Sequence, residues 1–229
     1  MMTLAEIWPM FALRIRCGPL ELAPVHDDDI PLLVALAQGG IHDAAVMPFL
    51  FPWTDATGDD LARNMALHYW QSRSAFSPER WGLAFVVRRE GVVVGIQAVG
   101  TQNYLVTKTG ETGSWLGLEH QGRGTGTLMR QALCAFLFDH LDAEEITSGA
   151  FVDNPSSMAV SMKVGYRPNG VGRECRRGVS SRCYGAWCSV RSTWFARPTR
   201  LRWRAWERSG GSSGWIDPSA ATPARGMPR

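Results

Sequence analysis

The hexapeptide Gln121-Gly122-Arg123-Gly124-Thr125-Gly126 is the most informative stretch of this 229-residue sequence. It follows a short β-rich segment, residues 114–118, and leads into residues 127–141, where apolar side chains recur at helical spacing. Glycine permits tight turns and lets backbone N–H groups approach a ligand, and the first turn of a helix offers further unpaired N–H donors. The sequence therefore predicts either a diphosphate-binding loop or a plain strand-to-helix connection here.

Two common phosphate-binding motifs are excluded by the residues of this loop. A Walker loop ends in Gly-Lys-Ser/Thr, and that ending is absent. The dinucleotide-binding motif requires Gly-x-Gly-x-x-Gly, and this loop lacks that spacing. Four or five hydrogen bonds to charged phosphate oxygens, each worth about 1.5–3 kcal/mol, would still hold a cofactor at such a loop.

Hydrophobic periodicity on both sides of the loop predicts a mixed α/β fold. Strands are grouped in the middle of the chain and alternate with helices after the loop, which is typical of a mixed sheet. The expected strands and extended segments are 11–25, 83–87, 92–96, 114–118 and 146–152, and the expected helices are 30–38, 57–76, 127–141 and 156–164.

The chain divides into two parts of opposite charge. Residues 1–172 hold 12 Lys and Arg against 18 Asp and Glu, whereas residues 173–229 hold 12 Arg against 3 acidic residues. The second part is rich in Arg, Trp and Ser, and from residue 209 its composition is typical of disorder. We therefore divide the chain into a domain, 1–178, and a basic tail, 179–229.

Cysteine and histidine patterns indicate neither a disulfide framework nor a metal site. The five cysteines form no Cys-x-x-Cys pair, and the five histidines form no His-Glu-x-x-His motif. Apolar runs are shorter than the roughly 18 residues that a membrane-spanning helix needs. The N-terminus lacks the basic region of a secretory signal. We expect a cytoplasmic protein that binds neither a metal nor a membrane.

A second motif makes a family resemblance specific. Asp153-Asn154-Pro155-Ser156-Ser157 leaves a strand and opens a helix that closes in Lys163-Val164-Gly165-Tyr166. Together with Gln121-x-x-Gly124-x-Gly126, this resembles the GNAT acyltransferase superfamily. Residues 113–117 and 148–157 resemble its RimJ/RimL-type branch, and 47–49 and 52–54 are similar to an actinobacterial subgroup with a mycobacterial member that uses succinyl-CoA. The resemblance covers about residues 8–178.

The resemblance implies a GNAT fold, with a mixed, mostly antiparallel sheet flanked by helices. In this fold two parallel central strands, here about 113–118 and 146–152, splay apart and hold the acyl-pantetheine arm between them. The implied reaction is transfer of an acetyl or succinyl group from acetyl-CoA or succinyl-CoA to a primary amine by direct attack. The implied acyl-CoA contacts are Leu116, Leu118, Gln121, Gly122, Arg123, Gly124, Thr125, Gly126, Thr127, Asn154 and Ser157.

Catalytic roles follow from the same resemblance. A backbone N–H near Leu116–Leu118, assigned to Leu118, would polarise the thioester carbonyl. Ser161 occupies the position of a tyrosine general acid in many members. Ser161 would there protonate the leaving thiolate. Serine is a poor acid, however, so two other roles stay open: Ser161 only hydrogen-bonds the sulfur, or it faces the helix surface. No general base is identifiable: Glu119 and His120 border the loop, and a water chain would also suffice. The candidates to contact the amine are His42, Asp43, Trp53 and Asp55.

Three functions stay open at this point. The protein is an N-acyltransferase for a protein N-terminus, a lysine or a small amine, or a non-catalytic acyl-CoA-binding module, or a nucleic-acid binder through its tail, which we rank last. The tail is either an out-of-frame translation of a GC-rich gene or a genuine basic arm, in which Trp187, Trp194, Trp203 and Trp206 would stack on bases. The branch resemblance suggests a homo-oligomer.

Overall fold

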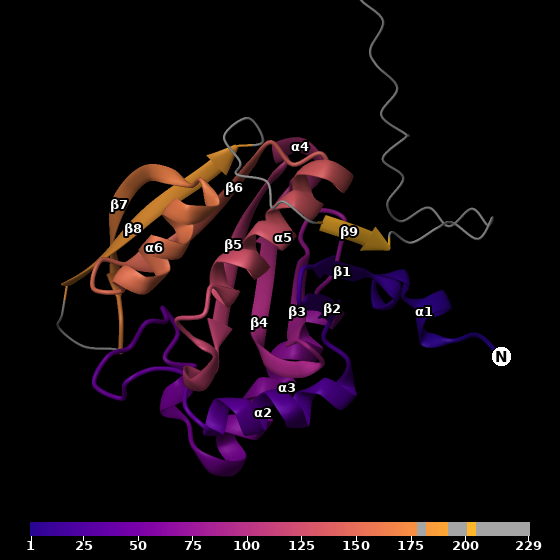
Figure 1. Ribbon diagram of the computed structural model, residues 1–229, viewed down its shortest axis with the longest axis horizontal. Coiled ribbons are helices and arrows are strands. Elements are labelled where there is room, and N and C mark those ends of the chain that lie inside the picture. Colours follow the sequence, from indigo (N-terminus) through magenta and orange to yellow (C-terminus); the bar gives the residue numbers. More distant parts are fainter. Residues whose placement is uncertain (178–181, 192–200, 205–229) are drawn as a thin grey trace, which may run out of the picture.

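A computed structural model describes residues 1–177, 182–191 and 201–204. In these ranges one sheet has the strand order β7-β8-β6-β5-β4-β3-β2-β1-β9 (Figure 1). Among these strands only β5 and β6 pair in parallel. The strands are β1 (Arg14–Cys17), β2 (Leu20–Pro24), β3 (Gly82–Arg89), β4 (Val92–Thr101), β5 (Thr109–Leu116), β6 (Glu145–Phe151), β7 (Arg167–Cys175), β8 (Arg182–Arg191) and β9 (Leu201–Arg204). The predicted mixed, mostly antiparallel fold is confirmed.

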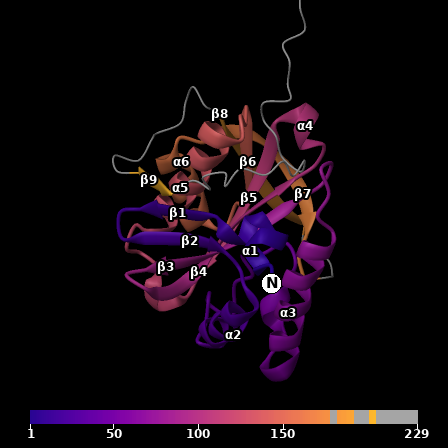
Figure 2. The ribbon, with the colours of Figure 1, turned by 90° about the vertical axis from the view of Figure 1, so that its right-hand side faces the viewer.

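Helices cover both faces of the sheet. One face packs against α5 and α6, and the other against α2 and α3, so that α5 and α3 lie on opposite sides in Figure 2. The α-helices are α1 (Leu4–Ile7), α2 (Ile30–Gln38), α3 (Gly58–Ser74), α4 (Tyr104–Thr107), α5 (Thr125–His140) and α6 (Pro155–Val164). Short 3-10 turns are η1 (Pro9–Ala12), η2 (Asp27–Asp29), η3 (Trp53–Asp55) and η4 (Leu118–His120).

Each helix layer buries an apolar stripe that is visible in the sequence. Leu61, Met65 and Tyr69 of α3 recur at i, i+4 and i+8, and all three are buried against the sheet. Helix α5 is buried along most of its length, including Met129 and Leu133. Two separate cores result, one on each face, and the sheet lies between them.

The ends of β5 and α5 differ from the predicted ones. We expected the strand to end at 118 and the helix to begin at 127, but β5 ends at Leu116 and α5 begins at Thr125. Gly124, at φ 77°, adopts the left-handed conformation that favours glycine, so the chain turns into the helix directly after it. Thr125, Gly126 and Thr127 therefore form the first helical turn instead of the loop.

The parallel pair diverges, as the splayed-strand prediction requires. Pairing joins only Thr109–Glu111 to Glu145–Thr147. Beyond these residues β5 stays with β4, and β6 stays with β8. A gap therefore opens between the last residues of β5 and those of β6.

The sheet continues past position 178, the predicted end of the domain. Strand β8 pairs with both β6 and β7, and its Cys188 and Val190 are buried. Trp187 of β8 packs so closely on Gly149 of β6 that a Cβ at Gly149 would lie 2.7 Å from its ring. Residues 178–181, 192–200 and 205–229 lie outside the described ranges. The out-of-frame and basic-arm explanations therefore stay predictions.

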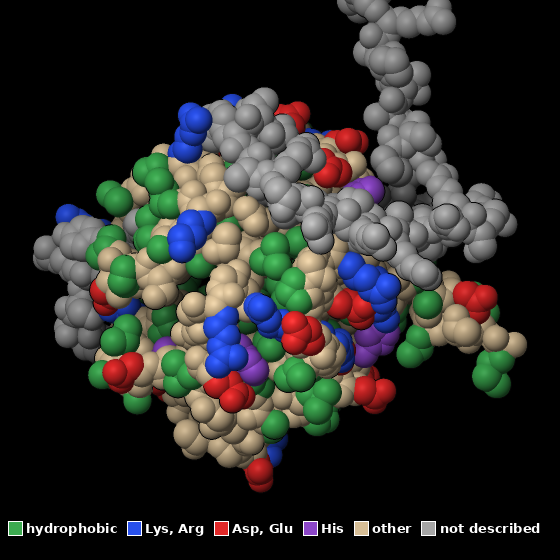
Figure 3. All heavy atoms as spheres, viewed as in Figure 1, with side chains coloured by type: hydrophobic (Ala, Val, Ile, Leu, Met, Phe, Trp, Pro, Cys, Tyr) green, Lys and Arg blue, Asp and Glu red, His purple; other side chains and the backbone are tan. Residues whose placement is uncertain are grey.

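Charges on the surface are mixed. Lys and Arg side chains alternate with Asp and Glu on the face shown in Figure 3. Within the described part of the chain, no helix has the length and apolar character to cross a membrane. In the same residues no three His, Cys, Asp or Glu side chains group as metal ligands would.

Candidate functional site

The gap between β5 and β6 begins where hydroxyl groups replace the regular strand pairing. Thr112 Oγ1 donates to the Thr147 carbonyl oxygen at 3.2 Å, and Ser148 Oγ donates to the Thr112 carbonyl oxygen at 3.4 Å. These bonds satisfy buried carbonyl groups at the point of divergence. From Ser114 to Leu116, β5 has no partner on the β6 side among the described strands. The gap is thus lined by backbone groups of β5.

The Leu116 N–H faces this gap. Gly117 N–H donates to the Val94 carbonyl oxygen at 3.1 Å, so Gly117 and Val94 form a hydrogen-bonded antiparallel pair. Such pairs alternate with pairs whose N–H and C=O groups point away from each other, and Leu116 opposite Gly95 is one of these. Consistently, the Leu116 carbonyl also points away from β4 and accepts from Gln121 Nε2 at 2.9 Å.

Leu118, to which we assigned the carbonyl-polarising amide, is differently placed. Its N–H donates to the Gly40 carbonyl oxygen at 3.0 Å, and its side chain is exposed. An amide already bonded to a carbonyl has no hydrogen to offer a substrate. Of these two amides, it is therefore that of Leu116 and not that of Leu118 that faces the gap, because strand register sets the direction of each N–H.

The first turn of α5 lies beyond the end of β5, and its N–H groups have no cap. Gly122 and Gly124 have φ values of 72° and 77°, and no side chain caps the helix at Gly124. The N–H groups of the first helical turn have no partner inside the helix, and the helix dipole adds partial positive charge there. Arg123 is exposed beside this turn and forms no ion pair with any described residue. The arrangement suits an anion.

Gln121, predicted to contact the acyl-CoA, uses its side chain inside the protein. Its Nε2 donates to the Ile41 carbonyl oxygen at 2.7 Å and to the Leu116 carbonyl oxygen at 2.9 Å. The amide therefore joins the glycine loop to the end of β5 and to the chain after α2.

Gln121→Ala should loosen the loop, because it leaves the Ile41 and Leu116 carbonyl groups without a donor. We expect a loss of about 1–3 kcal/mol in the free energy of unfolding and roughly tenfold weaker CoA binding. Urea denaturation and calorimetric titration with CoA measure the two effects. Gln71→Ala, at an exposed position of α3, is the control. Unchanged stability in Gln121→Ala would contradict the bridging role.

Thr125 directs its side chain into the protein and not toward the loop. The residue is buried, and its Oγ1 accepts from Arg89 Nη1 at 2.9 Å. Arg89, at the end of β3, thus brings a second cation to the base of the loop. We did not single out Arg89 from the sequence, because it lies 36 residues before Thr125 and carries no local motif.

Asn154 caps α6 on the opposite side of the gap. Its Oδ1 accepts from the Ser157 N–H at 3.1 Å, so both predicted residues are brought together as cap and first turn. The Asn154 Nδ2 group makes no hydrogen bond with the described residues and remains a donor.

Ser161 lies in a buried polar network and not on the helix surface. It is 1% exposed, its Oγ donates to the Ser157 carbonyl oxygen at 3.1 Å, and it accepts from Arg130 Nη1 at 2.7 Å. Arg130 of α5 is itself 4% exposed and also donates to Ser114 Oγ of β5. Sequence reasoning missed Arg130, although its i, i+4 relation to buried Cys134 places it on an inward face of the helix.

The comparison with known families decides the identity of this arrangement. Residues 20–167 match the acetyltransferase (GNAT) domain family. This chain belongs to the GNAT family. It is therefore an acetyltransferase by family. The diverging strands β5 and β6 and the loop before α5 all lie within the matched residues.

Solved structures share this GNAT fold at low sequence identity. RimL, a ribosomal L7/L12 α-N-protein acetyltransferase in complex with coenzyme A, is 15% identical with a TM-score of 0.64, over 78% of this chain and 97% of that one. RimJ of Mycobacterium smegmatis in complex with a CoA-disulfide is 16% identical with a TM-score of 0.62, over 79% and 86%. The microcin C7 self-immunity acetyltransferase MccE with acetyl-CoA and AMP is also 16% identical, with a TM-score of 0.61, over 76% and 92%.

The four residues predicted to contact the amine lie in the loop 41–56. His42 Nε2 bonds Thr54 Oγ1 at 2.7 Å, and Asp43 Oδ1 accepts from the Ala45 N–H at 2.9 Å. Trp53 packs on Trp115 of β5, with ring centroids 5.7 Å apart. These partners are within the protein, so the side chains shape this loop.

Two arginines after β7 attach the loop 41–56 to the sheet. Arg177 forms a bidentate ion pair with Asp55 and holds the pKa of that carboxyl below its usual range. Arg176 bonds the Met47 carbonyl oxygen at 2.7 Å and pairs with Asp153. The loop therefore lies against the end of β7, beside the start of α6.

A titratable carboxyl lies on β5 on the side away from Ser114. Burial, and next the negative charge of Glu174, raise the pKa of Glu111 above its usual value. Sequence inspection did not select Glu111, whereas Glu119, which it did consider, is highly exposed and lies 3.4 Å from His120.

The buried cysteine of the network is not a nucleophile. Cys134 has no exposed surface, and burial raises the pKa of its thiol to about 11. Its Sγ lies 3.3 Å from the Tyr166 hydroxyl.

We expect a thiol reagent to modify the exposed Cys175 at least about 100-fold faster than Cys134, because only a thiolate in contact with solvent reacts readily. Mass spectrometry after brief labelling at neutral pH, with denatured protein as the control, measures the ratio. Rapid native labelling of Cys134 would contradict it.

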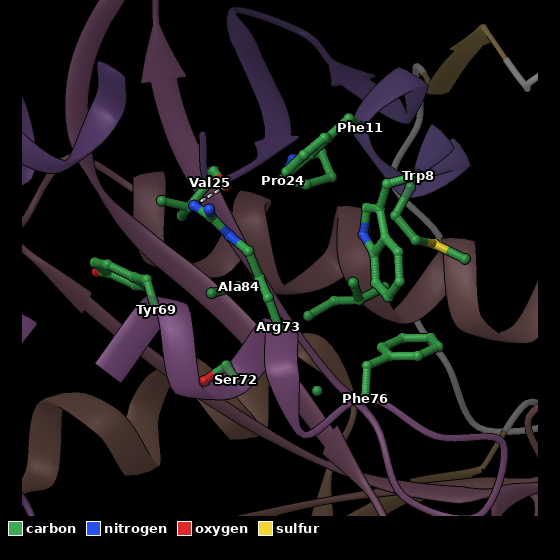
Figure 4. Close-up of a pocket in the computed structure, with 12 residues that line it drawn as sticks. Trp8, Phe11, Pro24, Val25, Tyr69, Ser72, Arg73, Phe76 and Ala84 are labelled. Atoms are coloured by element: carbon green, nitrogen blue, oxygen red, sulfur yellow. Dashed lines mark hydrogen bonds between the residues drawn. The ribbon is translucent and has the colours of Figure 1, made fainter. Parts of the chain in front are cut away.

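A separate pocket lies between the N-terminal segment and α3. Figure 4 shows Arg73 extending toward Val25, whose carbonyl oxygen accepts from it at 3.1 Å, and Trp8 above Phe76. The space open to a solvent-sized sphere is about 30 Å³, enough for one or two waters. This pocket is thus a packing defect near the N-terminus and not an acceptor site.

Proposed function

We propose that this GNAT protein transfers an acetyl group from acetyl-CoA to a primary amine, with acyl-CoA bound along the β5–β6 gap. The observation that carries the proposal is the gap itself, which leads to an uncapped helix N-terminus. A helix N-terminus binds anionic phosphates through its N–H groups, and an unpaired strand edge offers hydrogen-bonding groups to an extended, amide-bearing arm. RimL, which shares the fold, is described as an α-N-protein acetyltransferase, and this supports a protein N-terminus as one acceptor.

The residues of the site divide the donor molecule among them. The N–H groups of Arg123 to Thr127 and the Arg123 guanidinium would hold the diphosphate. Asn154 Nδ2 would donate to an amide oxygen of the pantetheine arm. The Leu116 N–H would donate to the thioester carbonyl oxygen, where negative charge develops during attack.

The reaction requires a neutral amine and a stabilised leaving group. The amine nitrogen forms the new C–N bond, the C–S bond breaks, and its electron pair stays on sulfur. The ammonium proton passes to solvent, directly or through a chain of water molecules. Ser161 is an unsuitable general acid because a serine hydroxyl is a far weaker acid than the thiol that would have to be protonated.

Acetyl-CoA is the better-supported donor. A succinyl group carries a terminal carboxylate on the side of the thioester carbon away from sulfur, and it needs a cation on that side, toward the loop 41–56. Arg176 and Arg177 lie nearest the loop 41–56, but their charges are offset by Asp153 and Asp55. We therefore expect succinyl-CoA to be the poorer substrate.

A thiol-release assay with acetyl-CoA and succinyl-CoA over a panel of amines tests the proposal. The panel contains peptides with free N-termini, peptides with an acetylated N-terminus and a lysine, and small amines. We expect amine-dependent thiol release with acetyl-CoA. Tight CoA binding without release on any amine would identify a non-catalytic binding module, and absence of CoA binding by folded protein would overturn the proposal.

A further inference from the structure

Arg130 is a buried cation without a carboxylate partner among the described residues. Its guanidinium is held by two neutral hydroxyl groups, Ser161 Oγ at 2.7 Å and Ser114 Oγ at 3.1 Å. Its Nε, also buried, has no hydrogen-bond partner in the described part of the chain. Removing an ion from water costs several kcal/mol unless charge and hydrogen bonds compensate, so this arrangement requires a reason.

The groups that face Arg130 do not neutralise it. The nearby titratable side chains are Cys134 on the same helix, Tyr166 after α6, and Cys188 on β8. Burial raises the pKa of all three, so they are uncharged at neutral pH. A guanidinium keeps its proton under these conditions. Among the residues that the structure describes, nothing therefore compensates the positive charge beneath the gap.

The two serines that Arg130 contacts lie on opposite sides of the gap. Ser114 precedes Leu116 by two residues on β5 and faces the same side of the sheet. Ser161 belongs to α6, the helix that Asn154 caps on the other side of the gap. The guanidinium thus spans from one side to the other where β5 and β6 have ceased to pair.

We infer that Arg130 is a positioning residue for acyl transfer, whose charge, acting through Ser161 and Ser114, stabilises the departing CoA thiolate. The inference rests on the proposed function. In the proposed complex the Leu116 N–H donates to the thioester carbonyl oxygen, and the sulfur is bonded to the same carbon. When the C–S bond breaks, the electron pair stays on sulfur, and the proton lost by the amine goes to solvent or a base. The thiolate then leaves unprotonated, with the guanidinium offsetting its charge.

This assignment explains the residue at position 161. A serine hydroxyl is too weak an acid to protonate a thiolate near neutral pH, but it carries a hydrogen bond from a cation to an anion well. With Arg130 donating to its oxygen, Ser161 can turn its own hydrogen from the Ser157 carbonyl toward the sulfur. No general acid is then required.

Titration of the thiol of bound CoA tests the inference without turnover. The ultraviolet absorbance of the thiolate, followed against pH, gives the pKa of bound CoA. A cation a few ångströms away at an effective dielectric constant near 20 lowers that pKa by about one to two units relative to free CoA. Arg130→Gln should abolish the lowering, Arg130→Lys should retain part of it, and Arg16→Gln, at an exposed site on β1, should retain all of it.

Kinetics supply the second readout. Arg130→Gln should lower kcat for acetyl transfer about 10- to 100-fold, with KM for acetyl-CoA and the affinity for desulfo-CoA changed less than about twofold. Parallel loss of desulfo-CoA binding would indicate a structural clip and overturn the inference.

The outcomes separate this inference from the proposed function. If wild-type protein binds CoA and the thiol keeps its solution pKa, Arg130 does not act on sulfur and only the inference fails. If folded wild-type protein does not bind CoA at all, the proposed function fails first. Should Arg130→Gln not fold, the wild-type titration and Arg130→Lys still decide.

Discussion

Gly126→Asp should weaken CoA binding at least about 100-fold while leaving the protein folded. A Cβ at Gly126 would meet Val160 Cγ2 at 3.5 Å and Leu116 Cδ1 at 3.8 Å, both ordinary contacts. The added carboxylate would stand in the first turn of α5, between α6 and the end of β5. Losing two hydrogen bonds to charged phosphate oxygens costs about 3 kcal/mol or more, and repulsion between anions adds to it.

Stability should not follow affinity in this variant. An acidic side chain in the first turn of a helix is favourable by about 0.3–1 kcal/mol, so Tm should stay equal or rise slightly. Gly100→Asp in β4 is the matched control for affinity, because its Cβ would meet nothing within 4 Å. Calorimetric titration with CoA and thermal unfolding give both quantities. Wild-type affinity in Gly126→Asp would show that the diphosphate binds elsewhere.

Gly95→Ala should be the most destabilising single-methyl change in the sheet. A Cβ at Gly95 would overlap the Trp115 carbonyl oxygen and approach the Leu116 Cα to 2.9 Å. The obstacle is backbone, which cannot rotate away, so β4 and β5 must separate. We expect a loss of about 2–4 kcal/mol in the free energy of unfolding, and a Tm lower by about 5–15 °C.

Activity should fall further than stability explains, because the displaced residue is Leu116. A shift of about 1 Å in a positioned donor costs about 100-fold in rate. Gly100→Ala, five residues along the same strand and without a neighbour within 4 Å, should change neither quantity. Urea denaturation and kcat on acetyl-CoA, measured below the unfolding transition, distinguish the two effects. An unaltered kcat in Gly95→Ala would exclude Leu116 as the carbonyl donor.

Sequence-based predictions succeeded where the cause is local. The tight glycine turn before α5, the helix opened by Pro155 and the closing Gly165, at φ 104°, each depend on a few consecutive residues. The buried stripe of α3 and the β3–β4 hairpin follow from periods of 3.6 and 2 in the same way. These elements, with the parallel strand pair implied by the family resemblance, are what place the candidate site.

Predictions about individual donors differ from the structure where partners are distant in the chain. Gln121 bonds a carbonyl 80 residues away, Thr125 a guanidinium 36 residues away and Ser161 one 31 residues away. No pattern in neighbouring residues encodes such bonds, so we assigned Gln121 to the ligand and did not select Arg89 or Arg130.

The choice between Leu116 and Leu118 illustrates the same physical division. Glycine φ preferences and helix-end hydrogen bonds act within one turn, so the amino-acid order alone indicates a glycine-rich turn between a strand and a helix. Which amide faces the gap depends on the register of β5 against β4, where a shift of one residue reverses every N–H. That register is set by Val94 and Gly95, more than 20 residues earlier, through packing of the whole sheet.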